Sequence, residues 1–170
     1  MHVFTIGHGT KPSEELIACL TAAGVQTLVD VRRFPGSRRN PQYNQAALEA
    51  ELGRNAIAYR HALDLGGRRS GVPGEENFAC LPAFAPYAAW MTTEPFAQAL
   101  DQALGAPTPC FMCAETVPWR CHRLLIADLL AARGHDVLHL LRPHEARPHR
   151  LSEAAEARGG RLYLCGTRVA

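Results

Sequence analysis

Short apolar runs typical of β-strands alternate with helix-like segments along this chain, and that alternation limits the folds open to it. The strand-like runs are Val3–Ile6, Thr27–Val31, Ile57–His61, Pro109–Cys113 and Asp136–Leu141. Strands separated by helices favour a mainly parallel sheet with helices on both faces. The sequence therefore predicts an α/β fold, a single three-layer αβα domain over residues 1–170.

The intervening segments carry helix signals. Ser13 is placed to cap a helix that ends near Gly24, because the apolar residues between them have helical spacing. Further helices are expected at Gln45–Leu52, Phe96–Leu104, His122–Arg133 and Leu151–Arg158, and a last edge strand at Leu162–Cys165. Proline is favoured in the first turn of a helix, so Pro95 suits the start of the helix at Phe96–Leu104.

Composition sets the expected location. No apolar run approaches the ~20 residues of a membrane span, and Met1–Thr5 lacks the basic and apolar regions of a signal peptide. We therefore expect a cytoplasmic protein without a membrane partner. The six cysteines are expected to be reduced and mostly buried, because the cytosol keeps thiols reduced. The sequence gives no indication of an oligomeric state.

Polar residues follow several of the predicted strands. Gly7-His8-Gly9 comes after the first strand, Asp30 and Arg32 end the second, and Glu115 follows the fourth. The carboxyl ends of parallel strands form the edge at which open α/β sheets bind ligands. We expect these residues to converge in one cleft at that edge.

Two carboxylates are the predicted catalytic residues. Asp30 ends an apolar strand, where an uncompensated charge is costly, so it is either paired with a nearby arginine or a tuned acid/base. Glu115 lies two residues beyond a strand end and is the second acid/base candidate.

Phosphate- or substrate-binding residues are expected on the same edge; they are His8, Arg32, Arg33, Ser37, Cys121, His122 and Arg123. Backbone amides of the Gly7-His8-Gly9 turn can face an anion, but the turn lacks the G-x-G-x-x-G pattern of a dinucleotide site. No cofactor is therefore expected. Arginine and serine on a Gly/Pro turn suit phosphate, although a solvated charged loop has the same composition.

Arginine is concentrated in one part of the chain. Between Arg32 and Arg69 lie eight arginines and three acidic residues, and Lys11 is the only lysine. An arginine-rich proteome would also enrich this residue, but a basic surface is the electrostatic footprint of a nucleic-acid binder. Nucleic acid is the expected partner.

The cysteines and histidine near the fourth strand have the ligand types of a zinc site. Cys110 and Cys113 fall within one predicted strand, and Cys121 and His122 are adjacent, so a shared metal is disfavoured and none is predicted. Cys121 at a helix start is either a nucleophilic or redox thiol with a lowered pKa, or a small buried residue.

Taken together, these motifs resemble the family catalogued as domain of unknown function 488. The resemblance covers most of the chain and rests on Gly7-His8-Gly9, Asp30-Val31-Arg32, Leu65-Gly66-Gly67, Cys113-x-Glu115 and Cys121-His122-Arg123. It implies a three-layer αβα domain. It also implies action on nucleic acid, because some members resemble glycosylases that excise oxidised or modified pyrimidines.

The resemblance thus implies a nucleic-acid-acting hydrolase, with DNA favoured as its partner, that is similar to a monofunctional DNA glycosylase for oxidised or modified pyrimidines. Phe34, Tyr43, Tyr59 and Trp119 lie in or near the site loops and could stack on bases. Water is the expected nucleophile, because a bifunctional lyase needs an amine and the chain has a single lysine. The alternatives are a cysteine-dependent enzyme on a small substrate and a non-catalytic nucleotide- or RNA-binding module.

Overall fold

A six-stranded sheet forms the centre of the molecule, and the computed structural model describes all 170 residues. The strands are β1 (His2–Gly7), β2 (Thr27–Asp30), β3 (Ala58–His61), β4 (Pro109–Cys113), β5 (Asp136–Arg142) and β6 (Glu145–Pro148). Their order is β3-β2-β4-β1-β5-β6, with only the edge strand β6 antiparallel to its neighbour. The predicted α/β fold with a mainly parallel sheet is confirmed.

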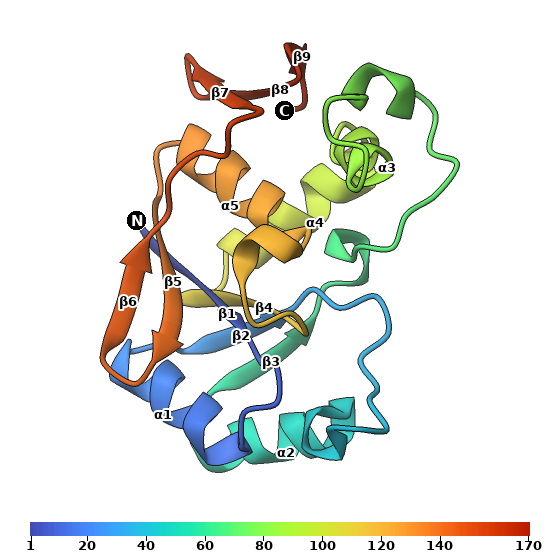
Figure 1. Cartoon of the computed structure of the whole chain (residues 1–170). Helices are drawn as coiled ribbons and strands as arrows, with labels where there is room; N and C mark the ends of the chain where they lie inside the picture. The colour runs from blue at the N-terminus through green and yellow to red at the C-terminus, as the bar shows by residue number, and fades with distance from the viewer.

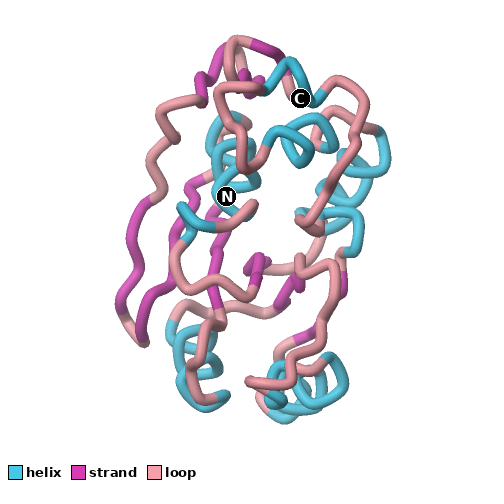
Figure 2. Tube along the Cα trace, turned by 45° about the vertical axis from the view of Figure 1, so that its right-hand side comes forward, coloured by secondary structure: helices cyan, strands magenta, loops and turns pink.

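Helices cover both faces of this sheet. On one face lie α1 (Ser13–Ala22) and α2 (Gln45–Arg54); on the other lie α3 (Ala85–Trp90), α4 (Glu94–Leu104) and α5 (Arg123–Ala132) (Figure 1). Figure 2 shows the strands as a layer between the two groups of helices. None of the helices has the length and apolar character needed to cross a membrane.

Two apolar cores follow from these layers, because successive residues of a strand face opposite sides of a sheet. Cys110 and Met112 of β4 pack with α1 and α2, whereas Phe111 and Cys113 pack with the helices of the other face.

The four short 3₁₀ helices are η1 (Pro41–Tyr43), η2 (Leu63–Leu65), η3 (Glu75–Phe78) and η4 (Pro118–Arg120). Ser13, expected as a cap, is instead the first residue of α1, and its side chain makes no capping bond.

The helix predicted at Leu151–Arg158 is wrong. This segment contains β7 (Ala155–Arg158), which pairs with β8 (Arg161–Leu164); β9 (Thr167–Arg168) completes a separate three-stranded antiparallel sheet. Gly159 and Gly160 adopt φ values of 56° and 76° and form a two-residue hairpin turn between Arg158 and Arg161. Such turns need positive φ at both positions, so the Gly-Gly pair outweighs the helix propensity before it.

Two of the six cysteines are not reduced, contrary to expectation. Cys80 and Cys165 form a disulfide that ties the small sheet to the segment between η3 and α3. They are 85 residues apart in the sequence, so no local sequence pattern predicts that they form a disulfide. Cys19, Cys110, Cys113 and Cys121 are free and buried.

The loop after β4 lies tightly over the end of β1. The backbone amides of His8 and Gly9 donate to the carbonyls of Cys113 (3.0 Å) and Ala114 (2.9 Å). A Cβ atom on Gly7 would overlap the carbonyl group of Glu115, so this approach requires glycine. The chain thereby brings Glu115 beside His8 at the carboxyl edge of the sheet.

Candidate functional site

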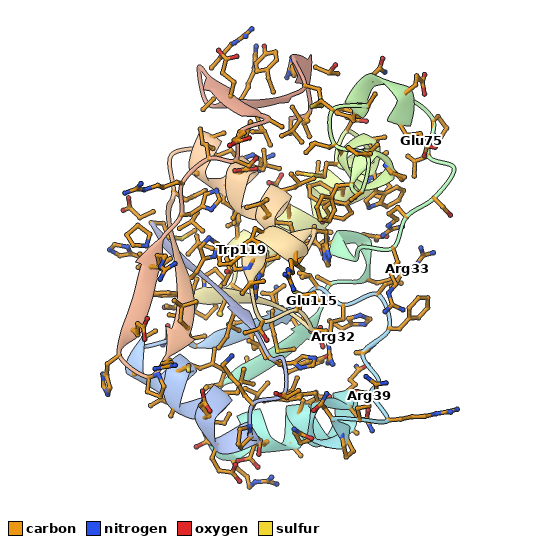
Figure 3. All side chains as sticks on the ribbon, viewed as in Figure 1. Arg32, Arg33, Arg39, Glu75, Glu115 and Trp119 are labelled. Atoms are coloured by element: carbon orange, nitrogen blue, oxygen red, sulfur yellow. A yellow bond between two sulfur atoms is a disulfide. The ribbon has the colours of Figure 1, made fainter.

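A cleft of about 830 Å³ opens at the carboxyl edge of the sheet. Its walls come from the loops after β1, β2, η2 and β4, from α3 and from the segment that leads into α5. The volume falls in the range of small-molecule and nucleotide pockets. In Figure 3, Arg32 and Glu115 lie near the middle of this face, with Arg33 and Arg39 on the loop that follows β2.

The lining of the cleft is strongly cationic. It contains one carboxylate, that of Glu115, and six arginines, which are Arg32, Arg33, Arg39, Arg68, Arg69 and Arg120. The side chains of Arg39, Arg68 and Arg120 are exposed and form no hydrogen bond or ion pair within the chain. Guanidinium groups left free in a concave site suit an anionic ligand such as phosphate.

Other arginines are held in place by the protein. Arg33 donates through Nη1 to the carbonyl of Arg68 at 2.9 Å. Arg69 donates through Nε to the carbonyl of Gly66 at 3.0 Å, and its guanidinium lies 4.0 Å from the ring centroid of Trp90. These contacts join the long loops after β2 and η2, so the cationic lining has a defined shape.

Asp30 is paired with Arg32, which is the first of the two predicted alternatives. The fully buried carboxylate accepts from Arg32 Nη2 at 2.6 Å, from Nε at 2.9 and 3.1 Å and from the Arg32 amide at 3.0 Å. The Tyr59 hydroxyl donates to the same carboxylate at 2.8 Å. Asp30 is not among the residues that line the cleft, and its hydrogen bonds fix the orientation of the Arg32 guanidinium.

His8 holds the other side of Arg32. Its Nδ1 donates to the carbonyl of Gly9 at 2.8 Å, which leaves Nε2 to accept from Arg32 Nη1 at 3.4 Å. The ring stacks on Tyr43 with centroids 4.1 Å apart. Burial lowers the pKa of His8 to about 4, so the imidazole is neutral at pH 7.

Glu115 is the only carboxylate free to act in the cleft. Its side chain is exposed and forms no hydrogen bond or ion pair within the chain. Trp119, which is 57% exposed, lies on η4 in the same connection between β4 and α5. A carboxylate in this setting can bind a water molecule or accept a proton.

His122 is another residue that lines the cleft. Its Nε2 donates to the carbonyl of Val31 at 3.2 Å, and its ring meets Tyr87 edge-on at 4.8 Å. Burial lowers its pKa to about 4. A Cβ atom on Gly67 would lie 2.6 Å from His122 Nδ1, so the close approach of the Gly66-Gly67 turn to the imidazole requires glycine at this position.

Seven of the nine predicted site residues line the cleft: His8, Arg32, Arg33, Ser37, Glu115, Cys121 and His122. Asp30 and Arg123 lie behind it and are at most 1% exposed. Arg123 donates through Nη2 to the carbonyls of Glu115 (3.3 Å) and Thr116 (3.4 Å), so it supports the loop that carries Glu115.

Some lining residues escaped the sequence interpretation. Tyr87 comes from α3, a six-residue helix too short to leave a periodic signal. Arg68 and Arg69 belong to the arginine-rich stretch that begins at Arg32, but they were not assigned to the site. The Gly66-Gly67 pair before them was the sequence feature that could have indicated a close approach of their loop to the site. No group of three or more His, Cys, Asp or Glu side chains is placed to hold a metal ion. Cys110 lies on the opposite face of the sheet from Cys113 and Cys121.

Fold and site define the class: a three-layer α/β protein with a cationic cleft at the carboxyl edge of its sheet. The family model described as Domain of unknown function DUF488 matches residues 12–130, and the chain belongs to that family, as its motifs predicted. The matched segment includes Asp30, Glu115 and His122. Comparisons with curated proteins and with solved structures found no similar chain.

Proposed function

We propose that this protein binds nucleic acid, with DNA favoured, and hydrolyses the N-glycosidic bond of an oxidised or modified pyrimidine. The observation that supports this most is the charge of the cleft, six arginines against one free carboxylate. Phosphate groups of a nucleic acid would neutralise the arginines, and the carboxylate would serve the bond-breaking step.

The free arginines suit a chain of phosphates better than a single one. Arg39, Arg68 and Arg120 come from three separate segments that meet around the cleft. Phe34 lines the cleft and is 64% exposed. Exposed aromatic rings stack on unpaired bases, and enzymes that act on a base must first take it out of the duplex.

Within this proposal Glu115 is the catalytic carboxylate and Asp30 a positioning residue. Glu115 accepts a proton from water while the water oxygen bonds to C1′ of the sugar. The bond between C1′ and the base nitrogen breaks, and the departing base takes up a proton. The carboxylate also stabilises positive charge that develops on the sugar in the transition state. The Asp30 carboxylate keeps Arg32 directed at the cleft by accepting hydrogen bonds from the backbone amide, Nε and Nη2 of Arg32.

Water, rather than an amine, is the proposed nucleophile. Lys11 is the only lysine; it lies outside the cleft lining and donates through Nζ to the carbonyl of Gly7 at 3.2 Å. A lyase mechanism requires an amine that forms a Schiff base with the opened sugar. The product is therefore an abasic site without strand cleavage.

Duplex oligonucleotides that contain 5-hydroxymethyluracil, 5-hydroxycytosine or thymine glycol test the activity, with abasic sites detected by cleavage in hot alkali. We expect Glu115→Gln to lower the rate at least ~100-fold, the usual scale for a positioned acid/base, while binding is retained. Glu49→Gln is the matched control, because Glu49 is exposed on α2 outside the cleft. Binding without abasic-site formation from any of these duplexes would favour a non-catalytic binding module. Equal rates for wild type and Glu115→Gln would exclude the assigned role.

A further inference from the structure

Arg123 is a buried cation with no anionic partner. Its side chain is 1% exposed, and its Nε and Nη1 atoms have no hydrogen-bond partner. Nη2 meets only backbone carbonyls, those of Glu115 and Thr116. A buried charge without compensation costs several kcal/mol, so a nearby group must supply negative charge.

Cys113 is placed to supply that charge. Its Sγ lies 3.8 Å from the carbonyl oxygen of Glu115, the same atom that Arg123 Nη2 approaches to 3.3 Å. The sulfur and the guanidinium therefore share one carbonyl group. A hydrogen bond from Cys121, the positive charge of Arg123 and a backbone hydrogen bond at Glu115 together lower the pKa of the Cys113 thiol against the opposing effects of burial and of the Glu115 charge.

Cys121 is a second thiol at the same place. Its Sγ accepts from the backbone amide of Arg123 at 3.4 Å and lies 3.6 Å from His122 Nδ1. Because His122 Nε2 donates to the carbonyl of Val31, the Nδ1 atom that faces the Cys121 sulfur carries no proton. The thiol also donates to Cys113, which raises the pKa of Cys121.

Both residues are buried, 2% and 4% exposed, but they belong to the lining of the cleft, which is the side from which a small oxidant would approach them. We propose that Cys113 and Cys121 are a redox-active thiol pair that reduces hydroperoxides, with Cys113 as the attacking thiolate and Cys121 as the resolving thiol. This activity would be additional to base excision and does not depend on it.

The chemistry balances in two steps. The Cys113 thiolate attacks the terminal oxygen of a hydroperoxide; an S–O bond forms, the O–O bond breaks, and the alkoxide takes a proton to leave as an alcohol. Cys121 then attacks the oxidised sulfur, and its proton goes to the departing oxygen. An S–S bond forms, the S–O bond breaks, and hydroxide leaves as water with that proton. The two thiols lose two electrons, which the hydroperoxide gains, and a dithiol reductant restores the pair.

Two other free thiols provide internal controls. Cys19 and Cys110 are buried and outside the cleft lining, and burial raises the pKa of each. A thiol that stays protonated reacts slowly with peroxide. Selective oxidation would therefore distinguish the proposed pair from general thiol damage.

The test treats the purified protein with near-stoichiometric hydrogen peroxide, blocks remaining thiols with iodoacetamide and maps tryptic peptides by tandem mass spectrometry. Cleavage after Arg120 separates Cys113 from Cys121, so their disulfide adds the Cys121 peptide to the Ser70–Arg120 peptide, which Cys80 already links to the Cys165 peptide. We expect this linked product, with Cys19 and Cys110 still alkylated after denaturation. In Cys121→Ser, oxidation should stop at a Cys113 sulfenic acid that a 1,3-diketone traps. In Cys113→Ser, Cys121 should remain reduced.

The role of Arg123 is tested through the alkylation rate of Cys113. Arg123→Gln should slow alkylation about tenfold at pH 7, because the thiolate loses its counter-charge, while Arg123→Lys should retain most of the rate. If the glutamine variant does not fold, the cysteine variants still decide the matter. Oxidation of all four free thiols at one rate, or oxidation of Cys121 in Cys113→Ser, would overturn the proposal. Base excision is measured separately, so failure of either activity is recognised on its own.

Discussion

The buried ion pair between Asp30 and Arg32 allows a quantitative test of how the site is held together. The two side chains are 0% and 6% exposed, and their closest atoms are 2.6 Å apart. Breaking a buried pair by removing one partner costs about 3–5 kcal/mol, because the other charge stays buried without compensation. We therefore expect Asp30→Asn and Arg32→Gln each to lower the free energy of unfolding by about 3 kcal/mol or more, toward the lower end of that range for Asn, which can still bond Tyr59.

The double variant separates pairing from simple loss of contacts. With both charges removed, neither is left unpaired, so its destabilisation should fall short of the sum of the single effects by about 1–3 kcal/mol. Urea denaturation followed by circular dichroism measures all three variants. Asp101→Asn is the matched control, because Asp101 is 69% exposed in its pair with Arg133 and such pairs contribute at most about 1 kcal/mol. Additive single effects, or effects no larger than the control, would refute this reasoning.

Three further predictions concern the fold. Because burial lowers the pKa of His8 and His122 to about 4, the unfolded chain binds more protons below about pH 6.5. The free energy of unfolding should then fall from there towards pH 4, by up to about 1.4 kcal/mol per pH unit for each histidine; urea titrations at several pH values check this, and His8→Gln should reduce the slope. Gly7→Ala should cost about 1–3 kcal/mol or more through overlap with the loop after β4, whereas Gly53→Ala, with open space around it, should be neutral or slightly stabilising in the same assay. Replacing both cysteines of Cys80–Cys165 by serine should lower the free energy of unfolding by about 2–4 kcal/mol, and an unchanged thermal midpoint would contradict this.

The main sheet was predictable because its signals are local. Pro109–Cys113 is an uninterrupted apolar run and forms β4 with the predicted bounds, and Thr27–Val31 differs from β2 by one residue. The C-terminal segment was not predictable from its composition alone. Glu153 to Arg158 favours a helix by propensity, but the Gly159-Gly160 turn pairs it with β8, whose Leu162 and Leu164 are buried. Tertiary burial decided the outcome there.

The edge at which the site lies followed from topology, because polar residues after parallel strands must meet. The surroundings of the individual side chains did not follow. The sequence showed Asp30 and Glu115 as equivalent carboxylates, whereas the structure buries Asp30 against Arg32 and Tyr59 and leaves Glu115 exposed. Tyr59 lies 29 positions away from Asp30 in sequence, and such a contact has no local signature.

The most direct test of the proposed function measures how binding to a duplex oligonucleotide depends on salt. If Arg39, Arg68 and Arg120 each contact one phosphate, the slope of log K against log salt concentration should be near −2.7, at about −0.9 per contact. Arg39→Ala combined with Arg68→Ala should reduce its magnitude by about 1.8. Arg161→Ala, which removes an exposed arginine from β8 outside the cleft, should leave the slope unchanged. Binding that does not vary with salt, or a slope that the double variant and the control change equally, would contradict a nucleic-acid-binding cleft.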